Sequence, residues 1–510
     1  MIRVFVQIHE MITLFSTYYF GEAEIAYWEW AVAIVYVLGL YVYFARIKNV
    51  RIRKEPEYKY LLWGLMAKLF AGIVFSLIYF YYYQGGDSVA YFYGAVSMRN
   101  LAMVDPLAYL NQLFGDNTLE NWNVYTWETG KPFQYLYFDD RTFFVIRITS
   151  LLAILSFNSY LNASLLIASA SFFGIWACFR TFVSYFPQQT GKLAIAFLFM
   201  PSVIFWGSAI LKDTFTISAV FWFIHSIDEI FFKKRNITSR VIILVLSSMI
   251  MVLIKPYIFM TLFPVMVLWL FYFRVVQIKN LLVKFVVVPI VMIGTGALCL
   301  SILDSLGDSL DKFALDEALN TIEVTQMDLA KVDWYGANSF NIGEFDGTWS
   351  GVFSKFPVAT NAALFRPYIW ESSSVVVAMS GLENLWVLWL TLLVIWQVGP
   401  GFVLRAMIGN PLILMSMSFA LLFGFIVGVT TPNFGALVRF KIPLIPLYIS
   451  ALYLIKYLGQ LKRVRENQGL RFDIRQFRRG SAHLDEFAGI QGKRHKTTYA
   501  KPGASLKPTV

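Results

Sequence analysis

Long apolar stretches follow one another along most of the chain, separated by shorter polar segments. Many approach or exceed the roughly 20 apolar residues that an α-helix needs to cross a bilayer. They do not alternate between polar and apolar residues, as the strands of a membrane β-barrel would. The pattern therefore predicts an all-α fold, a polytopic transmembrane helical bundle. About eleven spans are expected, near 25–45, 61–83, 160–179, 193–211, 214–232, 241–255, 257–273, 283–303, 384–399, 410–430 and 440–458.

The composition agrees with this pattern. Hydrophobic residues occupy 58% of the 510 positions and charged residues only 15%, which excludes a water-soluble domain of this size. Cys178 and Cys299 lie in separate apolar stretches, so neither a disulfide framework nor a thiolate metal site is expected. The formal net charge of +11 comes from loops and the tail, and no nucleic-acid-binding motif accompanies it. The expected partner is the lipid bilayer, with no nucleic acid.

Lys and Arg residues collect in alternate connections between the spans. Because short basic loops remain cytoplasmic, the N-terminus is expected outside and the C-terminus in the cytoplasm. This describes a multi-pass protein of the cell membrane, with the bacterial inner membrane as the expected location. The apolar segment 143–157 would break the alternation if it crossed, so it is expected to be an interfacial or re-entrant helix. Lys68 lies inside a span and is expected to snorkel toward its cytoplasmic end.

This topology leaves two long polar regions outside the cytoplasm, where helices in the loops are expected. Long loops are where a membrane enzyme commonly handles its substrate. The second region is acidic in its first half, which favours a solvated amphipathic cap. The expected organisation is 1–83 (an external segment and two spans), 84–142 (first external loop), 143–303 (membrane bundle with the interfacial helix), 304–383 (second external loop), 384–458 (C-terminal spans) and 459–510 (basic cytoplasmic tail).

The first candidate for chemistry is Asp87, in the sequence Gly85-Gly86-Asp87-Ser88 directly after a predicted span. A carboxylate at the bilayer surface stays ionised, so it can take a proton from a sugar hydroxyl or hold a divalent cation. Asp213 follows a predicted span on the same side and is the second candidate catalytic acid. No cofactor is assigned; a divalent cation is left open, with Asp87 as its ligand if one binds. The competing interpretation is that Asp87 only caps the next helix.

Further polar residues are predicted on the same face. Bases there could neutralise a phosphate, and aromatic rings could line a sugar pocket or the lipid path. Ion pairs at helix ends and headgroup anchors are the alternative explanation for each of them. The candidate substrate-binding residues are Lys212, Lys255, Tyr257, Arg366, Glu371, Arg439 and Lys441. Signatures such as a phosphate-binding GxxxxGK[ST] loop, a GxSxG elbow or an HExxH helix do not occur.

Over residues 61–275 and 360–458 the sequence resembles the GT-C superfamily of integral membrane glycosyltransferases, in particular the bacterial protein mannosyltransferase and lipid A aminoarabinose transferase group. The resemblance consists of an acid just after an early span (Asp87), a long first external loop, a second acidic turn (Asp213), and a late Arg-x-x-x-Pro-x-x-Pro segment that begins at Arg439. In this chain a single acid stands where the family pattern has a pair.

The resemblance implies transfer of a sugar from a polyprenyl-linked donor to a glycan, lipid or protein acceptor on the extracytoplasmic face, with Asp87 at the catalytic acidic position and Asp213 at the second acidic turn. Two other functions remain open. One is a polysaccharide repeat-unit polymerase, which also joins polyprenyl-linked sugars. The other is a non-enzymatic flippase or transporter of a lipid-linked glycan.

Overall fold

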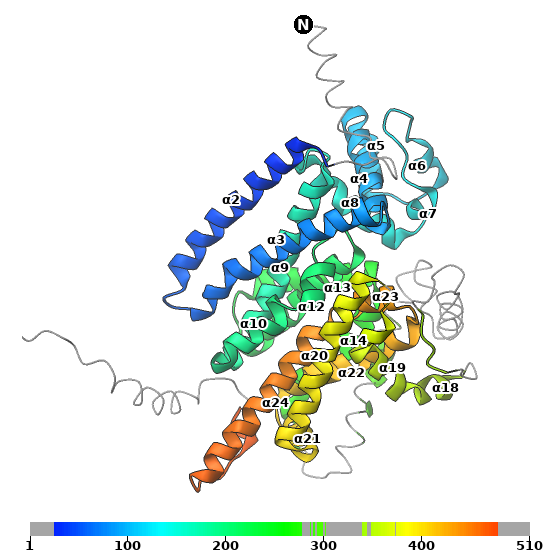
Figure 1. Cartoon of the computed structure of the whole chain (residues 1–510). Helices are drawn as coiled ribbons and strands as arrows, with labels where there is room; N and C mark the ends of the chain where they lie inside the picture. Colours follow the sequence, from blue (N-terminus) through cyan, green and yellow to red (C-terminus); the bar gives the residue numbers. More distant parts are fainter. Residues whose placement is uncertain are drawn as a thin grey trace, which may run out of the picture.

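The computed structural model describes residues 25–277, 286, 289–290, 293–298, 301, 339–343, 348–372 and 374–477. Within these ranges the fold is all-α (Figure 1). They contain no β-strand, and their one β-bridge joins Ser339 to Asn433. The predicted fold class is therefore confirmed.

Nine helices in this part of the chain are long and apolar enough to cross a membrane, which fits a multi-pass membrane protein. They are α2 (Tyr27–Arg51), α3 (Leu61–Leu77) extended by the turns η1 (Pro56–Tyr60) and η2 (Ile78–Tyr82), α9 (Tyr160–Tyr185), α12 (Lys212–Ile227) extended by η4 (Asp228–Lys233), α13 (Ile237–Ile254), α14 (Pro256–Gln277), α20 (Val375–Val398), α22 (Pro411–Thr430) and α24 (Leu444–Asn467).

Two of the eleven expected spans do not appear as single long helices in the described part of the chain. The stretch 193–211 is not one helix: α10 (Thr190–Leu198) ends before Pro201, where α11 (Pro201–Trp206) begins, and 207–211 is not helical. Proline starts a helix readily but is unfavourable inside one, because it lacks the N–H and clashes with the preceding turn. The span predicted at 283–303 lies largely outside the described residues. Segment 143–157 falls on the helix α8 (Asp140–Leu155).

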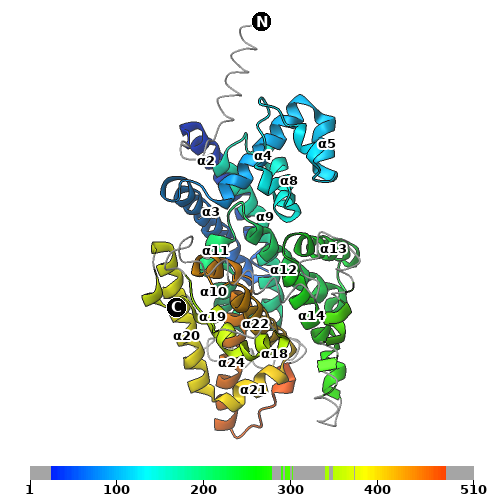
Figure 2. The ribbon, with the colours of Figure 1, turned by 90° about the vertical axis from the view of Figure 1, so that its right-hand side faces the viewer.

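The bundle is built around two central helices (Figure 2). Helix α9 packs against α3 and α12, and α22 packs against α14, α19 (Phe356–Phe365) and α24. At Gly174 of α9 an added Cβ atom would lie 2.4 Å from the carbonyl oxygen of Ser218 on α12. The two backbones therefore approach as closely as small residues allow, which is how helices commonly pack within membranes. Helix α2 lies at the edge of the bundle, and 11% of the residues in its most apolar stretch are buried.

Shorter helices surround the bundle. Helix α4 (Asp87–Val104) packs along α8, and the loop between them is tied down by Arg147, whose guanidinium donates to the carbonyl of Gln112 (2.7 Å) and to Oδ1 of Asn117 (2.8 Å). The remaining short helices are α5 (Pro106–Phe114), α6 (Leu119–Asn123), α7 (Gln134–Tyr137), η3 (Pro187–Gln189), α18 (Trp349–Ser354), η7 (Ile369–Glu371), α21 (Pro400–Gly409), α23 (Phe434–Phe440) and η8 (Ile474–Phe477).

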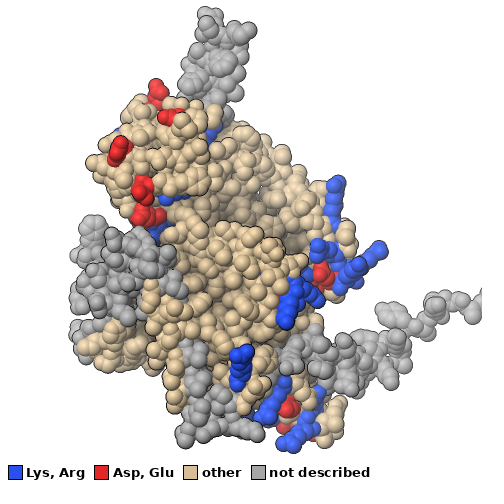
Figure 3. Space-filling model, turned by 180° about the vertical axis from the view of Figure 1, so that it is seen from behind, with Lys and Arg blue, Asp and Glu red and all other residues tan. Residues whose placement is uncertain are grey.

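The described molecule has two chemically different ends. At the basic end, defined by Arg51, Arg180 and Lys233, Arg180 binds Glu55 (2.7 Å) and Lys233 lies over the ring of Tyr185. Most of the Lys and Arg side chains visible in Figure 3 gather toward this end. We call the other the site end; it carries Asp87, Asp213, Lys255 and Arg439, which contact one another.

Candidate functional site

Four charged side chains from four separate elements form one ionic cluster at the site end. Nη1 of Arg439 lies 3.0 Å from Oδ2 of Asp87, and its Nε lies 2.9 Å from Oδ2 of Asp213. The second contact is an ion pair whose geometry is not that of a hydrogen bond. Nζ of Lys255 donates to Oδ1 of Asp213. The structure thus brings together both candidate acids and two of the candidate bases, which lie far apart in the sequence.

The turn before α4 places Asp87 in the cluster. The π-helical turn η2 ends the preceding helix, and Gly85 and Gly86 follow with φ angles of 147° and 101°. A side chain at Gly86 would be strained by that φ, and its Cβ would lie 3.0 Å from the ring of Tyr79. Asp87 is the first residue of α4, where the helix dipole stabilises a carboxylate.

The break between α11 and α12 places Asp213, the second residue of α12. The carbonyl of Gly207, directly after α11, accepts hydrogen bonds from Nζ of Lys68 and from Oγ of Ser171. A backbone carbonyl freed at a helix end inside a bundle must find such donors. Lys68 is 1% exposed, so the expectation that it snorkels is wrong. Its ammonium holds the broken helix instead.

Arg439 is positioned by α23. Oδ1 of Asn433 accepts from the N–H of Ala436 and so caps the helix. The segment 339–343, from the second long polar region, rests on the start of α23: the N–H of Phe340 donates to the carbonyl of Pro432 (2.7 Å), and the Phe340 ring stacks on Phe434. These contacts fix α23 where Arg439 reaches both acids.

The members of the cluster differ in their exposure to solvent and in their pKa. The Asp87 side chain is 52% exposed, whereas that of Asp213 is 2% exposed. Burial lowers the pKa of Lys255 to about 8, although Asp213 beside it favours the charged form. Burial acts on Arg439 in the same direction, but the carboxylates of Asp213 and Asp87 outweigh it and raise its pKa. Arg439 therefore stays charged, and Lys255 loses its proton near pH 8.

Lys212 does not join the four-residue cluster directly. Its Nζ binds Oδ2 of Asp139 at 3.0 Å. Burial opposes ionisation of Asp139, but Lys212 and the hydroxyl of Thr142 outweigh it and lower its pKa. Asp139 is a residue that the sequence analysis missed. The signal was there: Asp139-Asp140 are adjacent acids at the end of the first long polar region.

A neighbouring hydrogen-bonded cluster contains Arg366, Glu371 and Lys441. The guanidinium of Arg366 binds the Glu371 carboxylate through two nitrogens, and Nζ of Lys441 donates to the Arg366 carbonyl (2.9 Å) and to Oδ1 of Asn384 (2.8 Å). Burial lowers the pKa of Lys441, while Glu383 opposes that shift. Asn384 and Glu383 were not anticipated from the sequence. With these partners, the three candidates stabilise the turn that precedes α20.

The last candidate, Tyr257, is the second residue of α14, and its ring stacks on Phe423 of α22. It lies within electrostatic range of Asp213 and Arg439.

The carboxylates of the cluster are a poor set of ligands for a divalent cation. Oδ2 of Asp87 already contacts Arg439, and no group of three or more His, Cys, Asp or Glu side chains gathers within the described ranges. Divalent cations such as Mg²⁺ and Ca²⁺ normally take about six or more oxygen ligands.

No protein-family model matches the chain, and neither the curated proteins nor the solved structures include a significant match.

Proposed function

We propose that the chain is a membrane glycosyltransferase that moves a sugar from a polyprenyl-phosphate donor to a glycan, lipid or protein acceptor on the extracytoplasmic face. The supporting observation is the ionic cluster at one end of an apolar bundle, in which Arg439 lies beside the half-exposed carboxylate of Asp87 and Lys255 lies beside the buried carboxylate of Asp213. A lipid phosphate lies at headgroup level, so cations at a bundle end are well placed to bind it.

In the proposed reaction Asp87 accepts the proton of an acceptor hydroxyl, and the hydroxyl oxygen forms a bond to the anomeric carbon of the donor sugar. The bond from that carbon to the phosphate oxygen breaks, and its electron pair leaves with the polyprenyl phosphate. Arg439 and Lys255 compensate the charge that develops on the phosphate. Of the two acids only Asp87 has the exposure that a proton acceptor needs; Asp213 positions the two cations.

The test is transfer by the purified protein in lipid nanodiscs, with labelled polyprenyl-phosphate sugars as donors and a membrane extract as the source of acceptors. One donor should yield a new glycosidic bond, and nucleotide sugars should not. Asp87→Asn should lower the rate about 10²–10⁴-fold, the usual contribution of a general base. Glu120→Gln is the matched control, because Glu120 is an exposed acid of the same region, on α6. Wild-type turnover by Asp87→Asn would refute the assignment.

The same assay separates the other functions. A bond formed only from polyprenyl-diphosphate glycans would identify a repeat-unit polymerase. Movement of a labelled lipid-linked glycan between leaflets, with no bond formed from any donor, would identify a flippase and end the transferase proposal.

A further inference from the structure

The short helix α11 lies between the two groups of helices in the bundle. It packs against α3, which belongs to the group around α9, and it also contacts α20 and α23, which contact α24 and α22, respectively. Helix α12, with Asp213 in its first turn, follows α11 after the non-helical segment 207–211. Arg439 lies on α23. The placement of α11 therefore affects how Asp213 and Arg439 meet.

The start of α11 is bound by a buried carboxylate from α20. Oε2 of Glu383 accepts from the backbone N–H of Ser202 (2.7 Å), and Oε1 accepts from the hydroxyl of the same serine (2.5 Å). Both residues are buried. The first N–H groups of a helix lack partners within the helix, and the helix dipole favours an acid beside them. Because both of its oxygens are used, Glu383 holds the start of α11 in one orientation against α20.

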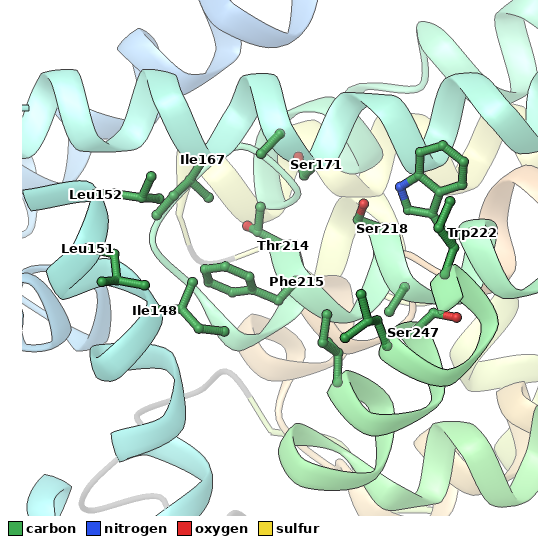
Figure 4. A pocket seen from close by; sticks show the side chains of 15 residues that line it. Ile148, Leu151, Leu152, Ile167, Ser171, Thr214, Phe215, Ser218, Trp222 and Ser247 are labelled. Atoms are coloured by element: carbon green, nitrogen blue, oxygen red, sulfur yellow. The ribbon is translucent and has the colours of Figure 1, made fainter. Parts of the chain in front are cut away.

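The end of α11 is bound by side chains from three other helices. The carbonyl of Trp206 accepts from Oγ1 of Thr214 at the start of α12 (3.3 Å). The carbonyl of Gly207 accepts from Oγ of Ser171 on α9 (3.0 Å) and from Nζ of Lys68 on α3. Ser171 and Thr214 are labelled in Figure 4, where both line a pocket beside α12. Helix α11 is thus bonded to the same end of α12 that carries the buried acid of the ionic cluster.

The residue after Glu383 binds the other part of the site. Oδ1 of Asn384 accepts from Nζ of Lys441 (2.8 Å), and both residues are buried. Lys441 follows Arg439 by two positions. Adjacent residues of α20 therefore bind the helix that leads to Asp213 and the segment that carries Arg439. Since Nε of Arg439 lies 2.9 Å from Oδ2 of Asp213, these contacts form a closed chain.

We propose that Glu383 is a positioning residue of the site. Through α11 on one side, and through its neighbour Asn384 and Lys441 on the other, it sets the position of Asp213 relative to Arg439. It acts through these neighbours, because it is itself buried. The predicted effect on transfer rests on the proposed function, whereas the effect on the ionic cluster does not.

The cluster is sensitive to this position because Asp213 contacts both of its cations, Arg439 and Lys255. A shift of Asp213 would displace the two groups proposed to bind the donor phosphate. Misplacement of a binding group by about 1 Å can cost on the order of 10²-fold in rate. Both cations would bind the phosphate before and during the reaction, so the loss should appear mainly in the KM for the donor.

The experiment measures donor KM for the whole protein in nanodiscs. Glu383→Gln keeps the length of the side chain but replaces one accepting oxygen with an amino group, and should raise the donor KM by up to about 10²-fold. Glu29→Gln is the matched control. Glu29 of α2 is 1% exposed and also accepts from a serine hydroxyl (Ser159, 2.5 Å) and from a backbone N–H (Ala26, 3.1 Å). The control should lower the unfolding midpoint to a similar degree and keep the wild-type KM.

A milder pair of variants guards against loss of the fold. Ser202→Ala removes the hydroxyl that binds Glu383 and leaves the backbone N–H in place, so its donor KM should lie between those of the wild type and Glu383→Gln. Ser159→Ala removes the corresponding hydroxyl beside Glu29 and should leave the donor KM unchanged.

A second measurement does not depend on activity. Thermal unfolding of Glu383→Gln, Asp213→Asn and the double variant should show that the double variant loses less than the sum of the two single shifts, because either change opens the same chain of contacts. Glu29→Gln combined with Asp213→Asn should give the sum. If Glu383→Gln does not fold, Ser202→Ala takes its place in the comparison.

The outcomes separate this inference from the function. Additive shifts for Glu383→Gln and Asp213→Asn would overturn the positioning role, and so would a donor KM equal to that of Glu29→Gln. If the wild type formed no bond from any donor while the shifts remained non-additive, the transferase proposal would fall and the link between Glu383 and the ionic cluster would stand.

Discussion

Asp87 and Asp213 contact the same guanidinium, yet their side chains are exposed to 52% and 2%. An ion pair that is half in water contributes little to stability. Breaking a buried pair is costly, because the remaining charge is left without a partner. The two acids look equivalent in the sequence, but their replacement should change the stability of the protein by different amounts.

We predict that Asp213→Asn destabilises the fold by about 3–5 kcal/mol, the range for breaking a buried pair, because Lys255 and Arg439 lose their shared counter-charge. Asp87→Asn should stay close to the wild type. Thermal unfolding in detergent, with both variants in one buffer, measures the difference. Equal midpoints for the two variants would contradict the assigned burial of Asp213.

A second prediction for a single residue concerns the pH at which Lys255 loses its proton. Its pKa is lowered to about 8, against about 10.4 in the unfolded chain. Between these values the unfolded state binds more protons, so stability rises with pH. In the proposed reaction the donor binds to the charged form of Lys255, so kcat/KM should fall over the same window, beginning near pH 8.

Stability should rise with pH while kcat/KM falls, and this difference distinguishes a role of Lys255 in binding from a role in stability. Lys255→Arg should move the fall in kcat/KM to higher pH, because arginine stays protonated throughout. A pH profile of the variant that still fell near pH 8 would assign the titration to another group.

At the scale of elements, the site depends on turns that interrupt helices. The clearest is Gly85-Gly86 before α4, where a positive φ and the Tyr79 ring leave no room for a side chain. We predict that Gly86→Ala costs about 1–3 kcal/mol in backbone strain and displaces Asp87, so that transfer falls more than stability does.

Gly39→Ala is the matched control for that variant. Gly39 lies in α2 with nothing within 4 Å of an added Cβ atom, and alanine favours a helix by up to about 1 kcal/mol. This control should keep full activity and a wild-type or slightly higher unfolding midpoint. If Gly86→Ala were equally active, the turn would not be what positions Asp87.

For the whole molecule, the two chemically distinct ends predict the topology. Residues 87, 213, 255, 366 and 439 are expected outside the cytoplasm, and residues 51, 235 and 475 inside. A single cysteine at 87, where the native side chain is 52% exposed, should react with an impermeant maleimide in intact cells, and cysteines at 51, 235 and 475 should react only after permeabilisation. The background is Cys178→Ala with Cys299→Ala. Labelling of position 235 from outside would overturn the orientation.

The sequence predicted the all-α fold because apolar length alone decides which segments can cross a bilayer. It also placed Asp87, Asp213, Lys255 and Arg439 on one face, since alternating spans fix the side of each loop. The break at Pro201 was missed although the proline was a local signal for it. The donor role of Lys68 could not be predicted, because it depends on a carbonyl group that becomes free on another element. Asp139 was missed although it belongs to a pair of adjacent acids; what the sequence could not show is its partner, because Lys212 lies on another element.

The contact between Arg439 and Asp87 joins residues 352 positions apart, and this has a consequence for biogenesis. During synthesis Asp213 and Lys255 enter the membrane first and can neutralise each other. At about 5–20 residues per second, Arg439 follows them only after an interval on the order of ten seconds or more. Until then the nascent chain lacks the arginine proposed to bind the donor phosphate. A chain released early would therefore be inert toward the lipid-linked sugars around it.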